Sequence, residues 1–134
     1  MLRLENITFS YDKETEALKD ITLNIEKGRK TLFLGENGSG KSTLFLIMNG
    51  LLQAQKGSIY FEGEKIKHKK KDLEDLRRKV GIIFQDPEIQ IFAPLVFQEV
   101  AYGPENLGYS SEKVEENVNR AMEEINITDL KDRP

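Results

Sequence analysis

The residues best suited to chemistry form one glycine-rich stretch, Gly35 to Ser42, with the spacing G-x-x-x-x-G-K-S. Glycines allow a backbone to fold into a tight nest, because they carry no Cβ atom that would clash. Consecutive main-chain N–H groups then point inward, where they bind phosphate oxygens. The pattern therefore predicts a loop that holds the phosphates of a nucleotide. The residues of this predicted loop are Gly35, Glu36, Asn37, Gly38, Ser39, Gly40, Lys41, Ser42 and Thr43.

Three side chains at the end of the stretch have separate predicted tasks. Lys41 places an ammonium group on the β- and γ-phosphates, so we count it as a catalytic residue. The hydroxyl of Ser42 binds Mg²⁺, a metal that prefers oxygen ligands and keeps several of its waters. The hydroxyl of Thr43 bonds the α-phosphate. A helix that begins near Lys41 adds the positive end of its dipole to the same site.

The elements around the loop favour an α/β fold. The segment 31–34, before the loop, is apolar on both faces, which is typical of a buried parallel strand. After the loop, Leu44 and Ile47 lie at helical spacing. The segment 80–84 is a second one with two apolar faces. We therefore predict a mostly parallel core sheet around the loop. For the loop itself, the alternative to a phosphate site is a glycine-rich loop without a ligand.

Residues 1–28 favour a different kind of sheet, because their apolar residues alternate with polar ones as in half-buried antiparallel strands. The alternation changes phase near Asn6, which indicates a bulge or two short strands. A strand over 57–61 and a short helix over 72–79 follow. This part predicts an antiparallel β subdomain at the amino terminus.

From about residue 87 the sequence predicts the start of a helical subdomain. Prolines interrupt a loop-rich stretch, and a short helix is expected over 96–102. Ser110 or Ser111 can cap the next helix. One apolar stripe on that helix faces its neighbours. The stripe consists of Val114, Val118, Ala121, Met122 and Ile125.

Composition excludes several classes of function. The chain has 134 residues, no cysteine and a single histidine, so disulfides and cysteine metal sites are excluded. His68 lies in the lysine-rich run 65–71, where we expect a solvated loop. The formal net charge of −3 argues against broad nucleic-acid binding. The longest apolar run, 44–48, is far shorter than the ~18 residues of a membrane span, and the charged amino terminus does not resemble a signal peptide.

The stretch Gly38 to Leu44 resembles the Walker A motif of ABC ATPases. The match extends along nearly the whole chain: 18–28 resembles the hairpin before that motif, and 80–87 resembles the strand that carries the Q-loop glutamine. A narrower resemblance, in 84–92 and 99–106, is to the ATPases of cobalt and energy-coupling-factor importers.

The resemblance, rather than spacing, assigns two more site residues. Tyr11 matches the aromatic residue that stacks on adenine; the alternative is an ordinary strand aromatic. Gln85 matches the glutamine that reaches Mg²⁺ and the attacking water, so it is expected as a catalytic and metal-binding residue; the alternative is a polar residue that ends a strand. The region 86–108 matches the surface that meets a membrane subunit, unless it only covers a core.

The resemblance implies an ATPase that uses ATP and Mg²⁺. Its relatives work in pairs, as homo- or heterodimers, beneath a membrane-embedded subunit at the cytoplasmic face of the membrane. They power uptake of a metal ion such as cobalt, or of a vitamin. The 134 residues then correspond to an incomplete nucleotide-binding domain: 1–86 is the β subdomain with the P-loop core, and 87–134 begins the helical subdomain.

Three motifs of the resembled family have no match among these residues: the signature that begins Leu-Ser-Gly-Gly, the Walker B strand and the switch histidine. We therefore expect an incomplete core, and nucleotide binding without turnover by these residues alone, because hydrolysis needs a positioned water and a group that orients it. A catalytically inactive nucleotide-binding fragment, an ABC-type ATPase outside transport, and a P-loop kinase or GTPase are the alternatives.

Overall fold

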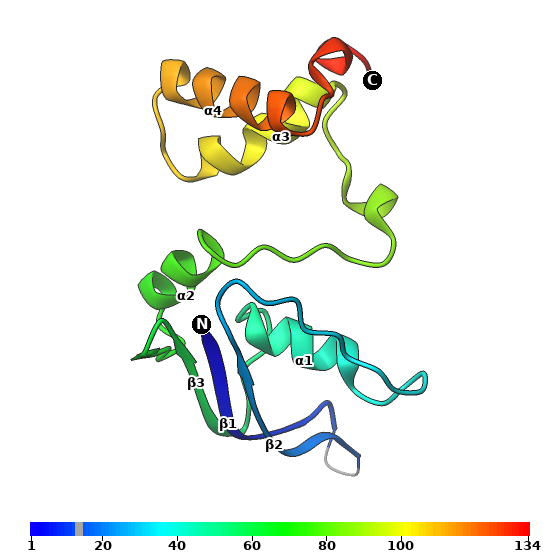
Figure 1. Cartoon of the computed structure of the whole chain (residues 1–134), viewed down its shortest axis with the longest axis vertical. Coiled ribbons are helices and arrows are strands. Elements are labelled where there is room, and N and C mark those ends of the chain that lie inside the picture. Colours follow the sequence, from blue (N-terminus) through cyan, green and yellow to red (C-terminus); the bar gives the residue numbers. More distant parts are fainter. Residues whose placement is uncertain (13–14) are drawn as a thin grey trace. The chain divides into compact units, whose positions relative to one another are not determined.

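The computed structural model describes residues 1–12 and 15–134. The chain folds into two compact units, Met1–Ile82 and Ile83–Pro134, and each is described by itself. The first unit contains a sheet with two helices, and the second is helical (Figure 1).

The sheet of the first unit has four strands in the order β2-β1-β3-β4, and every pairing is antiparallel. The central strand β1 (Leu2–Ser10) lies between β2 (Glu16–Ile25) and β3 (Lys56–Phe61), and β4 (Glu64–Lys65) pairs with β3. The predicted antiparallel subdomain at the amino terminus is therefore confirmed.

The phase change predicted near Asn6 is a bulge in β1. The register with β2 shifts between Leu4 and Ile7, and Asn6 has a left-handed φ of 51°. Two of its donors bond to β2: the Asn6 N–H donates to Thr22 Oγ1 at 2.9 Å, and Asn6 Nδ2 donates to Asp20 Oδ1 at 2.8 Å. Both Leu4 and Ile7 are buried as a result, although they have opposite parity along the strand.

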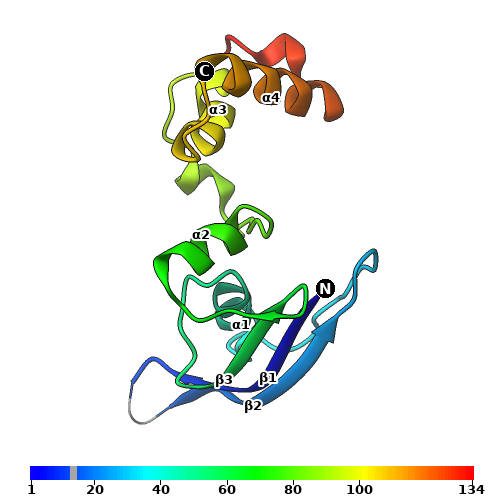
Figure 2. The ribbon, with the colours of Figure 1, turned by 90° about the vertical axis from the view of Figure 1, so that its left-hand side faces the viewer.

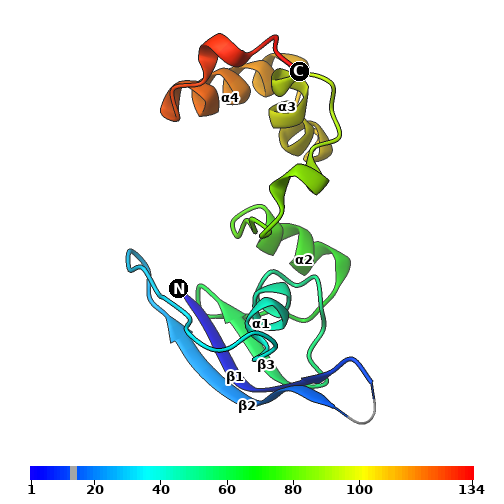
Figure 3. The same cartoon turned by 90° about the vertical axis from the view of Figure 1, so that its right-hand side faces the viewer.

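Helix α1 (Lys41–Met48) packs against one face of this sheet, as the three ribbon views agree (Figure 1, Figure 2 and Figure 3). The apolar residues of its inner side, predicted from helical spacing, join the side chains of β1 and β3. Burying a large aliphatic side chain contributes about 1.5–3 kcal/mol. The buried cluster consists of Leu2, Leu4, Ile7, Phe9, Leu18, Leu44, Ile47, Met48 and Ile59.

Helix α2 (Lys70–Arg77) is attached to the last residues of α1 and those after it. Its Leu76 is buried, and Arg77 Nη2 donates to the carbonyl oxygen of Gly50 at 2.7 Å. The buried Asn49, which ends α1, donates from Nδ2 to the carbonyl oxygen of Val80 at 2.6 Å. These bonds fix the far end of α1 relative to the chain that follows α2.

The second unit contains η1 (Pro87–Gln90), α3 (Val96–Asn106), α4 (Ser111–Glu124) and η2 (Thr128–Leu130). Helices α3 and α4 pack through Ala101, Val114, Val118 and Met122. Helix α3 is longer than the predicted 96–102 and includes Pro104. The predicted apolar stripe of α4 is narrower than expected, because Ala121 and Ile125 are exposed.

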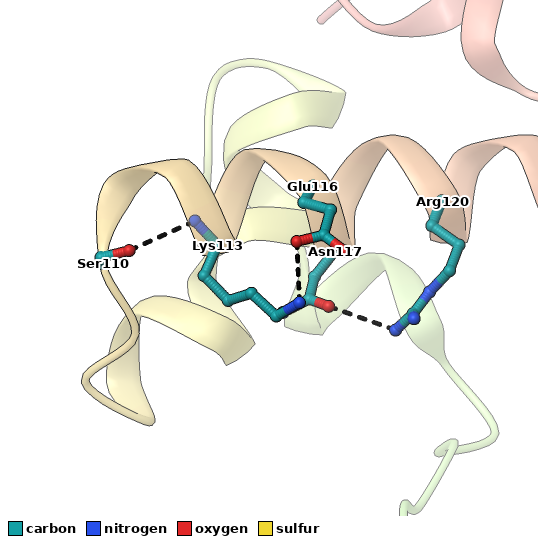
Figure 4. A network of polar contacts seen from close by, with 5 residues as sticks. All are labelled: Ser110, Lys113, Glu116, Asn117 and Arg120. Carbon is teal, nitrogen blue, oxygen red and sulfur yellow. Dashed lines mark hydrogen bonds and ion pairs between the residues drawn. The ribbon is translucent and has the colours of Figure 1, made fainter.

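Polar contacts on the outer side of α4 fix its first turns (Figure 4). Ser110 is the N-cap residue, and its Oγ accepts a hydrogen bond from the Lys113 N–H at 3.4 Å. Lys113 Nζ lies 2.7 Å from Glu116 Oε2, and this contact lowers the pKa of Glu116. Arg120 Nη2 donates to Asn117 Oδ1 at 3.2 Å. The predicted cap at Ser110 or Ser111 is thus confirmed at Ser110.

The two segments predicted as buried parallel strands do not form strands, and this prediction is wrong for the described chain. Residues 31–34 and 80–84 have no ladder pairing, and Leu32, Leu34 and Ile83 are 79%, 84% and 90% exposed. A strand with two apolar faces needs a hydrogen-bonded neighbour and a layer on each side. Neither segment has such a neighbour in the residues that the structure describes.

Candidate phosphate-binding site

The predicted phosphate loop connects the segment 31–34 to α1, and two of its glycines have left-handed backbones. Gly38 has a φ of 81°, and Gly40, the N-cap residue of α1, has a φ of 86°. A Cβ atom on Gly40 would lie 2.5 Å from the carbonyl oxygen of Ala17. Only glycine therefore fits at this position, and the absence of a side chain lets the loop lie against β2.

The amino terminus of α1 is suited to an anion. Among the described residues no side chain caps this helix, and its first turn contains no acidic residue. The first N–H groups of a helix lack partners within the helix, and they lie at the positive end of its dipole. An oxyanion at this end would receive hydrogen bonds from the main chain and a favourable field.

The ammonium group of Lys41 lies over the loop. Its Nζ donates to the carbonyl oxygens of Gly35 at 2.7 Å and Glu36 at 2.6 Å, and it lies 3.2 Å from Ser39 Oγ. The loop is closed by a turn in which the Ser39 N–H donates to the carbonyl oxygen of Glu36 at 3.2 Å. An ammonium group has three donors and a full positive charge, so this position suits a multiply charged phosphate chain.

The two hydroxyl residues after Lys41 have different surroundings. Ser42 is exposed at the first turn of α1. Thr43 is only 7% exposed, and its Oγ1 lies 3.1 Å from the hydroxyl oxygen of Tyr11. An exposed hydroxyl beside a phosphate loop can bind a metal ion, whereas the buried Thr43 hydroxyl already lies within hydrogen-bond distance of Tyr11.

Tyr11, predicted to stack on adenine, lies just after β1 and beside α1. Its ring packs edge-on against Phe9, with the ring centroids 4.9 Å apart and an interplanar angle of 89°. The residue remains 65% exposed, so part of its ring is accessible to solvent. The structure thus brings Tyr11 to the phosphate loop. Sequence reasoning missed its bond to Thr43, because spacing gives no signal for a contact across 32 positions.

The exposed hydroxyl of Ser42 fits a magnesium ion that arrives with phosphate. Among residues 1–12 and 15–134, no cluster of three or more His, Asp or Glu side chains could hold a metal ion. Mg²⁺ in nucleotide sites is commonly bound by one or two protein oxygens together with phosphates and waters. Ser42 can supply one such oxygen. Gln85 is exposed and belongs to the second unit, so its contact with the metal stays a prediction.

A hollow of about 610 Å³ lies elsewhere in the first unit, beside β3, β4 and α2. Acidic and basic side chains both line it, and Glu62 Oε2 lies 2.8 Å from Lys79 Nζ. This pairing lowers the pKa of Glu62 and raises the pKa of Lys79. With both signs of charge present, the hollow offers an anion no net attraction comparable to that of the phosphate loop.

A glycine-rich loop that opens a helix, with a lysine over it, is the arrangement of a P-loop protein. The family model described as "ABC transporter" matches residues 18–134, and the chain belongs to this family. The fold is accordingly that of the P-loop domain of ABC ATPases, with an amino-terminal antiparallel sheet and an incomplete core. No described helix is both long and apolar enough to cross a membrane.

Curated relatives match the chain over its whole length. A putative ABC transporter ATP-binding protein of Methanosarcina mazei is 49% identical over 134 residues, which is 100% of this chain and 30% of that protein. The energy-coupling factor transporter ATP-binding protein EcfA of Methanosphaera stadtmanae is 43% identical over 100% of this chain and 48% of its own length. The chain therefore spans less than half of either relative.

Solved structures agree with this assignment. The chain resembles cbiO1 of Clostridium perfringens, part of the ABC transporter complex cbiONQ, with a TM-score of 0.86 and 39% identity over 99% of this chain and 53% of that one. It also resembles the ATP-binding cassette MJ0796, a dimer bound to ADP and Pi, with a TM-score of 0.73 and 28% identity over 92% and 56% of the two chains.

Proposed function

We propose that this chain forms the phosphate-binding part of an ATP-binding subunit that powers an importer of a metal ion or a vitamin. The P-loop geometry carries the proposal: Lys41, Gly40 and the uncapped start of α1 meet at one place. Family membership supports adenine nucleotide as the ligand. The likeness to relatives named for the energy-coupling factor transporter, and to cbiO1, supports the importer class.

In this proposal the site residues divide the nucleotide among them. The main-chain N–H groups of 35–43 bind phosphate oxygens, and Lys41 places its charge on the β- and γ-phosphates. Ser42 and Gln85 hold the magnesium ion, which neutralises charge that develops on the phosphates. Gln85 also orients the attacking water. Tyr11 presents its exposed ring to the adenine.

We further propose that region 86–108 meets a membrane-embedded subunit and that the ATPase works as a pair, as a peripheral protein at the cytoplasmic face of the membrane. Exposed apolar residues in this region, among them Ile91, Phe92 and Tyr102, support a contact surface.

In the proposed domain organisation, 1–86 is the β subdomain with the P-loop core, and 87–134 begins the helical subdomain. Importers of this class need ATP hydrolysis, whereas these 134 residues alone are expected to bind without turnover.

The change Lys41→Ala tests nucleotide binding. Hydrogen bonds to charged groups contribute about 1.5–3 kcal/mol, so the dissociation constant for Mg-ATP should rise about 10- to 100-fold. The measurement is isothermal titration calorimetry on the wild-type and variant chains, with circular dichroism to verify folding. Because Lys41 also bonds the loop itself, the comparison is restricted to variants with wild-type spectra.

Lys71→Ala is the matched control, because it removes an equal charge from an exposed position on α2. It should leave the affinity for Mg-ATP unchanged. If Lys41→Ala bound Mg-ATP as tightly as the wild type, or if the folded wild-type chain bound no adenine nucleotide, the proposed function would be wrong.

A further inference from the structure

The contact between Tyr11 and Thr43 joins the residue predicted for adenine to the residue predicted for the α-phosphate. The two hydroxyl oxygens are 3.1 Å apart, within hydrogen-bond distance. Ring stacking does not need this contact, because a phenylalanine would offer the same face. The tyrosine hydroxyl therefore has a task that the proposed function has not yet used.

Hydrogen bonds tie Ser10, the residue directly before Tyr11, to the side chain of Gln55. The side-chain amide of Gln55 binds Ser10 on both sides: the Ser10 N–H donates to Gln55 Oε1 at 2.8 Å, and Gln55 Nε2 donates to the Ser10 carbonyl oxygen at 3.0 Å. The edge-on contact with Phe9 limits rotation of the tyrosine ring. Tyr11 thus reaches Thr43 from a strand end that Gln55 and Phe9 contact.

Thr43 is fixed as well. It lies in the first turn of α1 and is buried, and the N-cap residue Gly40 packs against the main chain at Ala17. The only freedom left to a buried threonine hydroxyl is the direction of its hydrogen atom. That direction depends on what the neighbouring oxygen atoms donate and accept.

The inventory of hydrogen atoms sets the direction of this bond when phosphate is bound. A hydroxyl group has one donor and can accept two bonds, while phosphate oxygens at neutral pH mainly accept. If Thr43 donates to a phosphate oxygen, it has no hydrogen left for Tyr11. Tyr11 must then donate to Thr43 Oγ1, and each bond in such a chain polarises and strengthens the next.

We propose that Tyr11 is a positioning residue whose hydroxyl orients the Thr43 hydroxyl toward the polyphosphate of the bound nucleotide. The ring and the hydroxyl of Tyr11 then have separate tasks, one on the base and one on the phosphates. This role rests on the proposed function, because it concerns the same phosphate site. It predicts that removing one oxygen atom from Tyr11 weakens phosphate binding, although the stacking face is kept.

Tyr11→Phe tests this role directly. A neutral hydrogen bond contributes about 0.5–1.5 kcal/mol net, which converts to an affinity for Mg-ATP about 2- to 12-fold weaker than that of the wild type. Thr43→Val removes the second hydroxyl at nearly constant shape. In the Tyr11→Phe/Thr43→Val double variant, the tyrosine change should cost nothing further, because its partner is gone. Calorimetry with Mg-ATP measures all four chains.

Inorganic tripolyphosphate separates this role from stacking, because it contains no base. Its competition with a fluorescent ATP analogue should weaken by the same factor in Tyr11→Phe as direct ATP binding does. Tyr60→Phe is the matched control: Tyr60 lies on β3, and its ring contact with Arg3 is kept by phenylalanine. This control should bind both ligands as the wild type does.

The outcomes distinguish the two proposals. A wild-type chain that is folded but binds no ATP overturns the proposed function. A wild-type chain that binds ATP, with Tyr11→Phe equal to it, overturns the positioning role alone. Losses that multiply in the double variant also overturn it, since independent effects mean that the two hydroxyls do not act together. A Tyr11→Phe chain that binds ATP more weakly but tripolyphosphate as tightly as the wild type would show that the hydroxyl acts on the base. That result overturns the positioning role as well.

Discussion

Replacing Gly40 by alanine should destabilise the first unit more than any other single methyl group added to the phosphate loop. The new Cβ would lie 2.5 Å from the carbonyl oxygen of Ala17 and 2.9 Å from Leu18 Cδ2. The first of these neighbours is main chain in β2, so it cannot move aside as a flexible side chain would. The backbone of Gly40 is also left-handed, with a φ of 86°.

Two costs add to give the expected magnitude. An L-residue in the left-handed region costs about 1–2 kcal/mol, and overpacking a close contact costs about 1–3 kcal/mol. The free energy of unfolding should therefore fall by about 2–5 kcal/mol, a large part of the ~5–15 kcal/mol that a typical domain has. Nucleotide binding should weaken in parallel, because Gly40 starts α1.

Two further glycines separate the costs. Gly38→Ala has a φ of 81° but nothing within 4 Å of the added Cβ, so it should lose only the backbone term of about 1–2 kcal/mol. Gly81→Ala has open space and no left-handed φ, so it should be neutral or stabilising by ~0.4–1 kcal/mol. Urea unfolding followed by far-ultraviolet circular dichroism measures all three variants.

The expected order of stability is Gly81→Ala, then Gly38→Ala, then Gly40→Ala. Equal losses in Gly38→Ala and Gly40→Ala would refute the steric part of this reasoning. A Gly40→Ala chain as stable as the wild type would refute both parts.

Ser110→Ala should lower the stability of the second unit by about 0.5–2 kcal/mol, as loss of an N-cap does. Because the bond from the Lys113 N–H to Ser110 Oγ is long, at 3.4 Å, we expect a loss in the lower half of this range. Thermal unfolding measures the change, and an unchanged midpoint would contradict a capping role. His68 has a pKa below its ordinary value of 6.5, first because of burial and second because of the Arg77 charge. Its stabilising contribution is therefore complete above pH 6.5 and is lost as the pH falls through the lower folded pKa. His68→Asn should remove that part of the acid sensitivity, and asparagine tolerates the left-handed φ of 52° at this position. If the stability of the wild type and of His68→Asn changed with pH in parallel, the prediction for His68 would be wrong.

The phosphate loop was the most predictable part of the site, because it is recognised from the types and spacing of residues that are neighbours in the sequence. The pattern from Gly35 to Ser42 gave the loop, and the structure begins α1 at Lys41 as expected. The bulge at Asn6 could also be predicted, since a change in alternation has one simple geometric cause. Whether these residues bind nucleotide stays a prediction.

The segments 31–34 and 80–84 show what local pattern could not decide. Their apolar faces describe a strand inside a sheet, but a strand exists only where a neighbour supplies hydrogen bonds and cover. Among the described residues that neighbour is lacking, and Leu34 and Ile83 are exposed. The apolar pattern of the two segments indicates that they are suited to a buried strand. Whether they form a strand depends on neighbouring strands and covering layers, about which the pattern of the segment itself contains no information.

The bond from Asn49 Nδ2 to the Val80 carbonyl oxygen ties the carboxyl end of α1 to the main chain that follows α2. One end of α1 is the place proposed for the phosphates, and the other end grips the main chain shortly before Gln85. A helix transmits displacement along its axis with little bending over two turns. A displacement of the phosphate end of α1 along the helix axis would therefore also move the Val80 carbonyl oxygen, within the same unit.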